Sequence, residues 1–185
     1  MGYAESALAL ERKFCRFEDG IDVSGDCEIS GYASVFGASD QSGDVVQKGA
    51  YERSLKAMAQ DGRRVKMLWQ HDPAKPIGVW QVVREDTKGL FVKGRILADV
   101  QAGSEALSLV KAGAIEGLSI GYRTVRSEKS SKGNRLLCEL DLWEVSLVTF
   151  PMLPEARIGA GAKGDETLAE ELVTALAAAK ARLSG

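Results

Sequence analysis

The sequence predicts an α+β fold, consisting mostly of antiparallel β-sheet with two short helices. Several segments between residues 27 and 150 alternate apolar and polar side chains, as half-buried strands do. Short connections rich in turn-forming residues separate them, which favours antiparallel neighbours. Two further stretches space their apolar residues at a helical period. With 185 residues, the chain is long enough for one domain with a sizeable core.

The first two elements are a strand and a helix. Residues 27–36 alternate and contain aromatic and β-branched side chains, so we predict a strand that ends at Gly37. Residues 50–60 carry apolar side chains at helical spacing, and Asp61-Gly62 follows as a stop signal. A short helix is expected there.

The next segment places a chemically important residue at a strand end. Residues 65–69 alternate, with Val65, Met67 and Trp69 on one apolar face. This strand is expected to deliver His71 at its end, before a turn at Asp72-Pro73.

A hairpin and the second helix follow. Residues 77–84 and 90–96 have β character and are joined by a short polar turn. Ser104 is the expected N-cap of the second helix, and Gly113 sits where a left-handed C-cap is expected.

The last part of the chain divides into sheet and appendage. Residues 115–125 and 136–150 are predicted strands around a polar hairpin loop at 126–134. Beyond them the composition changes to Gly and Ala, and an alanine-rich amphipathic helix is expected near the C-terminus, available for a partner. We therefore predict a folded domain over residues 1–160 and a linker with a helix over residues 161–185.

Composition argues against several functions. A formal net charge of −2 gives no global attraction to nucleic acid, and the basic stretch 123–135 is typical of a solvated loop. No apolar run is long enough to cross a bilayer, and the N-terminus lacks secretory features, so a cytoplasmic protein without membrane association is expected. Three cysteines without CxxC spacing disfavour a zinc site or a disulfide framework, and we interpret them as reduced core residues. Asp40 and Asp44 in a Gly/Ser loop are typical of turns rather than of a metal site, so no metal or cofactor is predicted.

His71 and Ser119 are the candidate catalytic residues. His71 is the only histidine, so a side chain that exchanges protons near neutral pH has one candidate. Ser119 lies in Gly117-Leu118-Ser119-Ile120-Gly121, where only glycines flank it on its own face. Missing side chains there let another backbone approach, which a nucleophile attacking a peptide carbonyl requires. The ordinary alternatives are a histidine that satisfies a turn and a serine in a glycine-softened strand.

The third candidate is Glu144. In residues 136–144 the even positions are apolar until Glu144, which places a carboxylate on the apolar face. Such a carboxylate could orient the histidine, although pairing with an arginine explains the pattern equally well. Asp141 is the reserve choice. Cys138 is set aside as a nucleophile because it lies among leucines, where a buried thiol is inert.

The spelling and order of these motifs resemble the prohead, or capsid maturation, proteases of tailed phages, a family also found in gene transfer agents. The GxSxG spelling alone does not indicate an α/β-hydrolase, because His71 precedes the serine and a strand follows it. Five segments in this order carry the resemblance: residues 31–36, 43–46 with 49–51, 68–72 with 76–78, 117–122, and 144–151 with 154–157.

The resemblance implies a fold similar to the herpesvirus assemblin proteases, a β-barrel ringed by helices. It implies His71 as general base and Ser119 as nucleophile. Assemblins use a second histidine as third member, which this chain lacks, so Glu144 is expected in that role. Backbone N–H groups near Met152 and Leu153 are expected to stabilise the oxyanion.

The family also suggests partners and a location. The implied substrate is the scaffolding segment of the major capsid protein, together with the protease itself, inside the immature capsid in the bacterial host cytoplasm. A second copy of the chain is a further candidate partner, and the C-terminal helix would be a packaging or self-cleaved element. Two alternatives stay open: a non-catalytic capsid assembly module with a degenerate site, and a nucleic-acid-binding barrel that uses the basic stretch 123–135.

Overall fold

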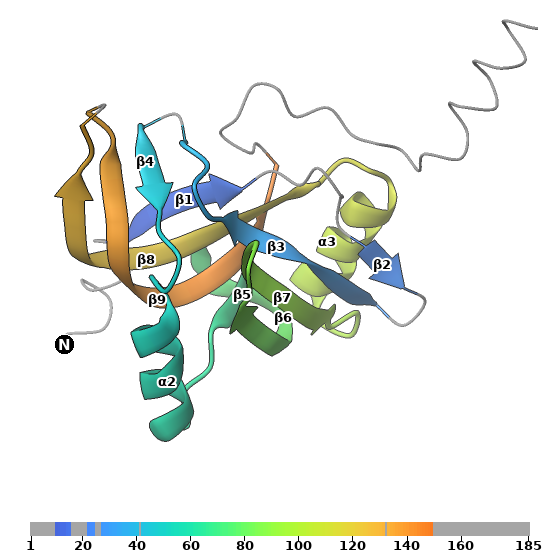
Figure 1. Cartoon of the computed structure of the whole chain (residues 1–185). Helices are drawn as coiled ribbons and strands as arrows, with labels where there is room; N and C mark the ends of the chain where they lie inside the picture. Colours follow the sequence, from blue (N-terminus) through green and yellow to red (C-terminus); the bar gives the residue numbers. More distant parts are fainter. Residues whose placement is uncertain (1–9, 16–21, 25–26, 41, 132, 150–185) are drawn as a thin grey trace, which may run out of the picture.

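The computed structural model describes residues 10–15, 22–24, 27–40, 42–131 and 133–149. These residues form one curled sheet of nine strands with two helices (Figure 1). In chain order the elements are β1 (Glu11–Cys15), β2 (Asp22–Ser24), β3 (Glu28–Val35), β4 (Asp44–Val46), α2 (Glu52–Gln60), β5 (Lys66–Trp69), β6 (Asp72–Glu85), β7 (Gly89–Ile96), α3 (Gln101–Lys111), β8 (Gly117–Lys129) and β9 (Arg135–Val148).

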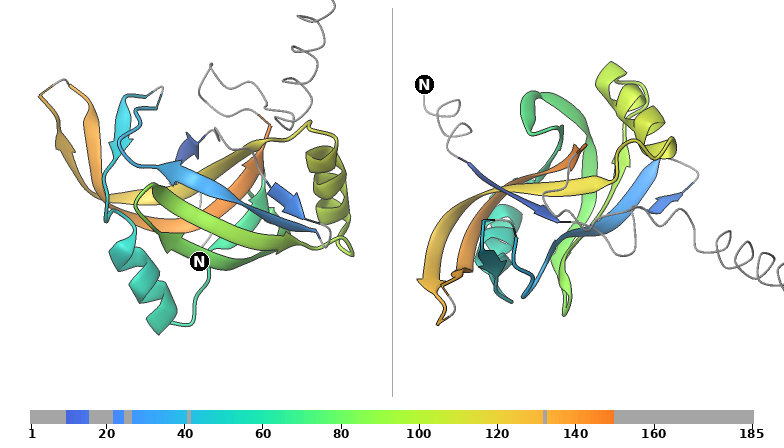
Figure 2. Two further views of the ribbon diagram at one scale, coloured as in Figure 1. Left: turned by 45° about the vertical axis from the view of Figure 1, so that its right-hand side comes forward. Right: turned by 90° about the horizontal axis from the view of Figure 1, so that it is seen from above.

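The sheet has the order β1-β8-β9-β5-β6-β7-β3-β2, and β4 pairs with β9 beside this path. Most neighbours are antiparallel, as expected, but β4 and β5 both run parallel to β9. The barrel expectation needs correction, because the described part of the sheet is a curled half-barrel whose end strands, β1 and β2, are not paired with each other (Figure 2). Similarity to the assemblin barrel stays a prediction.

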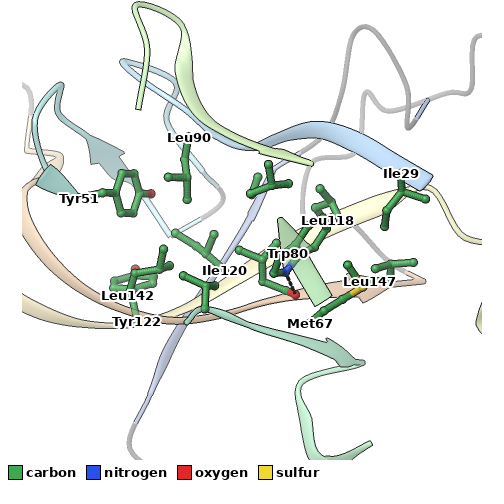
Figure 3. Packing of buried hydrophobic residues seen from close by; sticks show 14 of the residues in the cluster. Ile29, Tyr51, Met67, Trp80, Leu90, Leu118, Ile120, Tyr122, Leu142 and Leu147 are labelled. Carbon is green, nitrogen blue, oxygen red and sulfur yellow. Dashed lines mark hydrogen bonds between the residues drawn. The ribbon is translucent and has the colours of Figure 1, made fainter. Parts of the chain in front are cut away.

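The core lies on the inner side of this curl. Figure 3 shows Leu118, Ile120 and Tyr122 of β8 and Leu142 and Leu147 of β9 among the side chains packed there. Trp80 of β6 contributes the largest ring and donates its indole N–H to the main-chain oxygen of Val145, 3.2 Å away. A buried indole thereby keeps a hydrogen-bond partner while filling the core.

The helices partly match the expectation. α2 coincides with the predicted helix, which ends before Gly62. The N-cap prediction for α3 was wrong: the helix begins at Gln101, and Ser104 lies in its first turn, where its N–H donates to the oxygen of Val100. The C-cap prediction is confirmed, because Gly113 has a φ of +70° and closes the helix end with the bonds of a Schellman motif. None of the described helices combines the length and apolar character needed to cross a bilayer.

The long strands β8 and β9 extend further than predicted. Their pairing continues, through several register shifts, as far as Lys129 and Arg135, so residues 126–129 of the expected loop are strand. Only the tip from Ser130 to Asn134 turns. The paired ends form an arm that projects from the sheet beside β4 (Figure 1).

Candidate active site

His71 occupies a tight turn between β5 and β6. Trp69 pairs with Asp72, so Gln70 and His71 are the two residues of the loop, and both have positive φ, +53° and +61°. The turn was predicted one step later, at Asp72-Pro73, and this is incorrect. Positive φ at both loop positions is the pattern of a type I′ hairpin, which normally uses Asn and Gly. Two bulkier residues held there store backbone strain, a feature that clusters at functional sites.

Hydrogen bonds to β9 and its end hold the strained turn in place. The N–H of Gln70 donates to the oxygen of Leu147 over 3.0 Å, and its side-chain amide donates to the hydroxyl of Thr149. The N–H of His71 donates to the hydroxyl of Ser146 over 3.2 Å. These bonds therefore fix the backbone of His71 against the end of β9, so the direction of its side chain is not set by the alternation along β5.

The imidazole of His71 contacts Glu144. Nδ1 lies 2.5 Å from Glu144 Oε1, and Ser146 donates its hydroxyl to Glu144 Oε2 over 2.6 Å. An ionised carboxylate at this position can only accept, which would assign the proton of a neutral imidazole to Nδ1 and leave the lone pair that a general base needs on Nε2. We call His71, Glu144 and Ser146 the His71 cluster. All three side chains are buried.

Glu144 reaches this position through a β-bulge. Gly121 pairs with Glu144 but Tyr122 pairs with Leu142, so Trp143 is an extra residue in β9. Before the bulge the even-numbered Leu140 and Leu142 face the core. Beyond it the alternation of side chains between the two faces is reversed, so the odd-numbered Val145 faces the core. The expectation that Glu144 shares the apolar face was therefore incorrect: it lies on the opposite face.

That face also carries Ser119. Ser119 pairs with Ser146 and Gly121 pairs with Glu144, and side chains two residues apart in a strand share a face. Directly opposed residues of an antiparallel pair have their Cβ atoms about 4.5–5.5 Å apart. Ser119 is thus the cross-strand neighbour of Ser146, which itself bonds to His71.

Gly121 makes room for the carboxylate. A Cβ atom at Gly121 would lie 2.2 Å from Glu144 Oε1. The sequence interpretation assigned the glycines beside Ser119 to the approach of another backbone. At Gly121 the space is filled by the Glu144 side chain instead.

Ser119 itself is covered by β1. Its exposed fraction is 0%, and its hydroxyl donates to the main-chain oxygen of Lys13 over 3.2 Å. Phe14 of β1 pairs with Ser119 in an antiparallel register. A second backbone of the same chain does lie beside the serine, but it reaches Ser119 by in-plane strand pairing and not through the space that the glycines leave open.

The remaining candidates lie elsewhere. Asp141 accepts hydrogen bonds from the Trp143 indole at 2.8 Å and from the Ser54 hydroxyl, whereas Glu144 is the carboxylate at His71 Nδ1. Cys138 was expected to be buried, but it is partly exposed because it points from β9 toward the side of α2 rather than into the core. Cys27 is likewise partly exposed and packs against the core. Met152, Leu153 and the C-terminal helix lie outside the described residues.

A second polar cluster anchors β1. Lys13 Nζ bonds to Asp40 Oδ2 at 2.9 Å and to the main-chain oxygen of Asp44 at 2.7 Å. Arg135 binds Asp44 through two hydrogen bonds and also pairs with Glu11. We call Glu11, Lys13, Asp40, Asp44 and Arg135 the Lys13 cluster.

Charge pairing in the Lys13 cluster shifts two pKa values. Burial raises the pKa of Glu11, but hydrogen bonds from Thr124 and Arg135 outweigh it, so the pKa lies below the ordinary 4.5. Hydrogen bonds to Asp44 and Glu11 raise the pKa of Arg135. Within the described ranges, no three His, Cys, Asp or Glu side chains are grouped as metal ligands. Asp40 and Asp44, once weighed as a metal pair, are bonded to Lys13 and Arg135.

The basic stretch 123–135 is largely engaged with the protein. Arg123 lies over the ring of Trp143 at 4.9 Å from its centroid, Arg126 pairs with Glu128, and Arg135 belongs to the Lys13 cluster. These contacts use its arginines for folding rather than presenting them as a row to a polyanion.

Sequence reasoning missed three residues of the site. Ser146 had a usable signal, since it lies two residues after Glu144 and shares its face. Gly121 was singled out for the approach of another backbone, whereas its missing side chain makes room for Glu144. Lys13 gave no signal, because its partners lie 27 and 31 residues away.

Comparison with known sequences finds one family. The sequence model described as caudovirus prohead serine protease matches residues 18–170. The prohead protease of Enterobacteria phage HK97 is 31% identical over 135 residues, covering 71% of this chain and 59% of that protein. The prohead protease of Escherichia phage T5 is 28% identical over 134 residues, covering 72% of this chain and 62% of that protein. The chain therefore spans about three fifths of the length of these two relatives.

Two further similarities are to a capsid polyprotein and to a capsid assembly protease. Part of the chain, 102 residues, is 32% identical to the capsid polyprotein of Pseudomonas phage PAJU2, covering 51% of this chain and 15% of that protein. The solved structure of the bacteriophage T4 capsid assembly protease superposes with a TM-score of 0.63 at 14% identity, covering 75% of this chain and 96% of that one. At that identity the superposition shows a shared fold.

Proposed function

Since the chain belongs to the caudovirus prohead serine protease family, we propose that it is a serine endopeptidase that uses Ser119 as nucleophile, His71 as general base and Glu144 as the third member. One observation carries this assignment. The strained turn places His71 Nδ1 against Glu144, on the sheet face where Ser119 opposes Ser146. With the Ser119 hydroxyl turned from Lys13 toward Nε2, this arrangement would give the order carboxylate, imidazole, hydroxyl that proton transfer from a serine requires.

The reaction follows from these positions. As Ser119 Oγ forms a bond to the substrate carbonyl carbon, its proton moves to His71 Nε2. The imidazolium is stabilised by Glu144, and it then gives the proton to the amine nitrogen as the peptide C–N bond breaks. His71 then takes a proton from water as the water oxygen attacks the ester carbon, and returns that proton to Ser119 Oγ as the C–Oγ bond breaks, which releases the carboxylic acid and restores both residues. Backbone N–H groups near Met152 and Leu153 are the proposed oxyanion donors.

Ser146 is a positioning residue in this scheme. Its hydroxyl accepts from the His71 N–H and donates to Glu144. It therefore couples the turn to the carboxylate and fixes the direction of the imidazole, while Asp141 remains the reserve third member with no such contact.

The proposed substrate is the scaffolding segment of the major capsid protein, with the protease itself as a second substrate. Support comes from relatives that are named prohead protease and from a related region in a protein named capsid polyprotein. The corresponding location is the interior of the immature capsid in the bacterial host. In this proposal residues 1–160 are the protease domain and residues 161–185 are an appendage that serves packaging or is removed by self-cleavage.

Co-expression with the major capsid protein of the same phage or prophage tests the proposal. Shortening of the capsid protein is expected with the wild type and is lost with Ser119→Ala and His71→Ala. Ser127→Ala, an exposed serine on the same strand, is the matched control and should cleave normally. Uncut capsid protein in every case, with normal particle assembly, would favour the non-catalytic assembly module.

A further inference from the structure

The covered nucleophile needs an explanation. A serine with 0% exposure whose hydroxyl donates to Lys13 cannot reach a substrate carbonyl. β1 is an end strand of the described sheet, so among the described strands its main chain pairs with β8 only, while its side chains Glu11 and Lys13 bond to the rest of the Lys13 cluster. If β1 leaves, Ser119 and the whole edge of β8 become available for another extended chain.

β1 has the features of a bound peptide. It is extended and antiparallel to β8, and it places a peptide carbonyl, that of Lys13, beside the Ser119 hydroxyl. Adding a strand to a sheet edge is a general way in which proteins bind extended peptides, with main-chain bonds for affinity and side-chain pockets for specificity.

The Lys13 side chain fills such a pocket. Lys13 is only 4% exposed, and its ammonium group donates hydrogen bonds to Asp40 Oδ2 and to the main-chain oxygen of Asp44. The other oxygen of Asp40 accepts from the N–H groups of Ser42 and Asp44 at 2.9 and 2.8 Å, so the carboxylate is already oriented by its own loop. When Lys13 leaves, a largely buried carboxylate lacks a cation, and such a charge strongly favours a new one.

We propose that β1 is a built-in substrate mimic that keeps the enzyme latent, and that the active enzyme binds substrate along β8 in its place with a lysine or arginine at the position of Lys13. This inference rests on the proposed serine protease function. The register makes the basic residue the one immediately before the scissile bond, because the carbonyl of Lys13 is the one beside Ser119. Asp40 and the Asp44 carbonyl are the specificity-determining groups.

The latch is tested by the rate at which a small fluorophosphonate labels Ser119. Lys13→Glu places a negative charge against Asp40, and Asp40→Asn removes the charge while keeping the acceptor oxygen for Ser42 and Asp44. Both full-length variants are expected to be labelled at least about tenfold faster than wild type, because a buried ion pair that holds the latch is broken. Arg12→Glu, an equal charge change on the exposed neighbour in β1, should match wild type. Asp40→Asn keeps the test decisive if Lys13→Glu does not fold.

The outcomes separate the two proposals. Labelling of Ser119 at one common rate in wild type and all variants would overturn the latch and leave the serine enzyme standing. Absence of labelling in every folded variant would overturn both proposals.

The specificity pocket is tested with matched peptides in the Lys13→Glu variant. Fluorogenic peptides with lysine or the uncharged, isosteric norleucine before the cleaved bond are compared. Lysine should be favoured at least about tenfold in kcat/KM, since it restores a charge-assisted hydrogen bond. Adding Asp40→Asn should abolish the preference. Equal kcat/KM values in Lys13→Glu would contradict the pocket.

Discussion

The His71 cluster and the Lys13 cluster both bury charged side chains and both include residues of β9, but they are chemically opposite. The Lys13 cluster sets two strong cations against three carboxylates, and its pKa shifts move Glu11 and Arg135 further from proton exchange near neutral pH. The His71 cluster joins an imidazole to a carboxylate and a hydroxyl, with the reactive serine one strand away. Burial of charge alone thus does not mark a catalytic site: one cluster fixes a strand, whereas the other can move a proton.

The largest expected effect that distinguishes the clusters is on turnover. Glu144→Gln should lower kcat by about 10³–10⁴, because the amide can donate to Nδ1, which favours the wrong tautomer, and cannot stabilise the imidazolium. The measurement is kcat on a cleavable capsid peptide. Asp141→Asn is the control and should change kcat by less than about threefold. A larger loss for Asp141→Asn than for Glu144→Gln would assign the third member to Asp141.

The next effect tests the space that Gly121 provides. Gly121→Ala should lower kcat by about 10², since the new Cβ displaces the Glu144 carboxylate and a shift of about 1 Å at a catalytic group costs that much. In a Glu144→Gln background the same change should cost far less, because both substitutions damage one unit. Additive losses would show that Gly121 acts through something other than Glu144.

Stability should respond most in the other cluster. Arg135→Met removes the partner of Asp44, which is 6% exposed, and should lower the free energy of unfolding by about 2 kcal/mol without lowering kcat. Urea unfolding provides the measurement. The exposed pair of Arg126 and Glu128 supplies the control, and Arg126→Met should cost less than about 0.5 kcal/mol. Equal costs would mean that the Lys13 cluster is no more than surface charge.

The smallest expected effect is a pH dependence of the contribution that Glu11 makes to the free energy of unfolding. Its pKa is lowered on folding, so its contribution to stability is fully present above the ordinary 4.5 and is lost as the pH falls through the lower folded value. Glu11→Gln should therefore reduce the free energy of unfolding at about pH 7, by less than about 1 kcal/mol, and match wild type at about pH 3. If the difference in the free energy of unfolding between wild type and Glu11→Gln grew as the pH fell, the pKa of Glu11 would be raised on folding and not lowered.

The fold was accessible from the sequence where local rules decide it. Alternation of apolar and polar side chains predicted β3, and helical spacing of apolar residues predicted α2. The position of Gly113 predicted the C-cap of α3. The wrong predictions share a cause, which is an interruption of the local period. The bulge at Trp143 reversed the faces of β9, so Glu144 was singled out from a pattern that does not hold there. The Gln70-His71 turn lacks the Asn and Gly that signal type I′ hairpins, and only its bonds to β9 hold it.

The covering of Ser119 was beyond sequence reasoning for a different reason. It depends on pairing between segments more than a hundred residues apart, held by the ion pairs of Lys13 with Asp40 and of Glu11 with Arg135. No local pattern encodes such contacts. The glycines beside Ser119 did not predict it either, because β1 pairs with β8 in the plane of the sheet and the space at Gly121 is taken by Glu144.

The most direct test of the account is to map the residue modified by a fluorophosphonate, using mass spectrometry on the Lys13→Glu variant with and without His71→Ala. The account predicts a single adduct on Ser119 that disappears when the imidazole is removed. An adduct on any other serine, or an undiminished adduct on Ser119 without His71, would contradict the assignment of nucleophile and base.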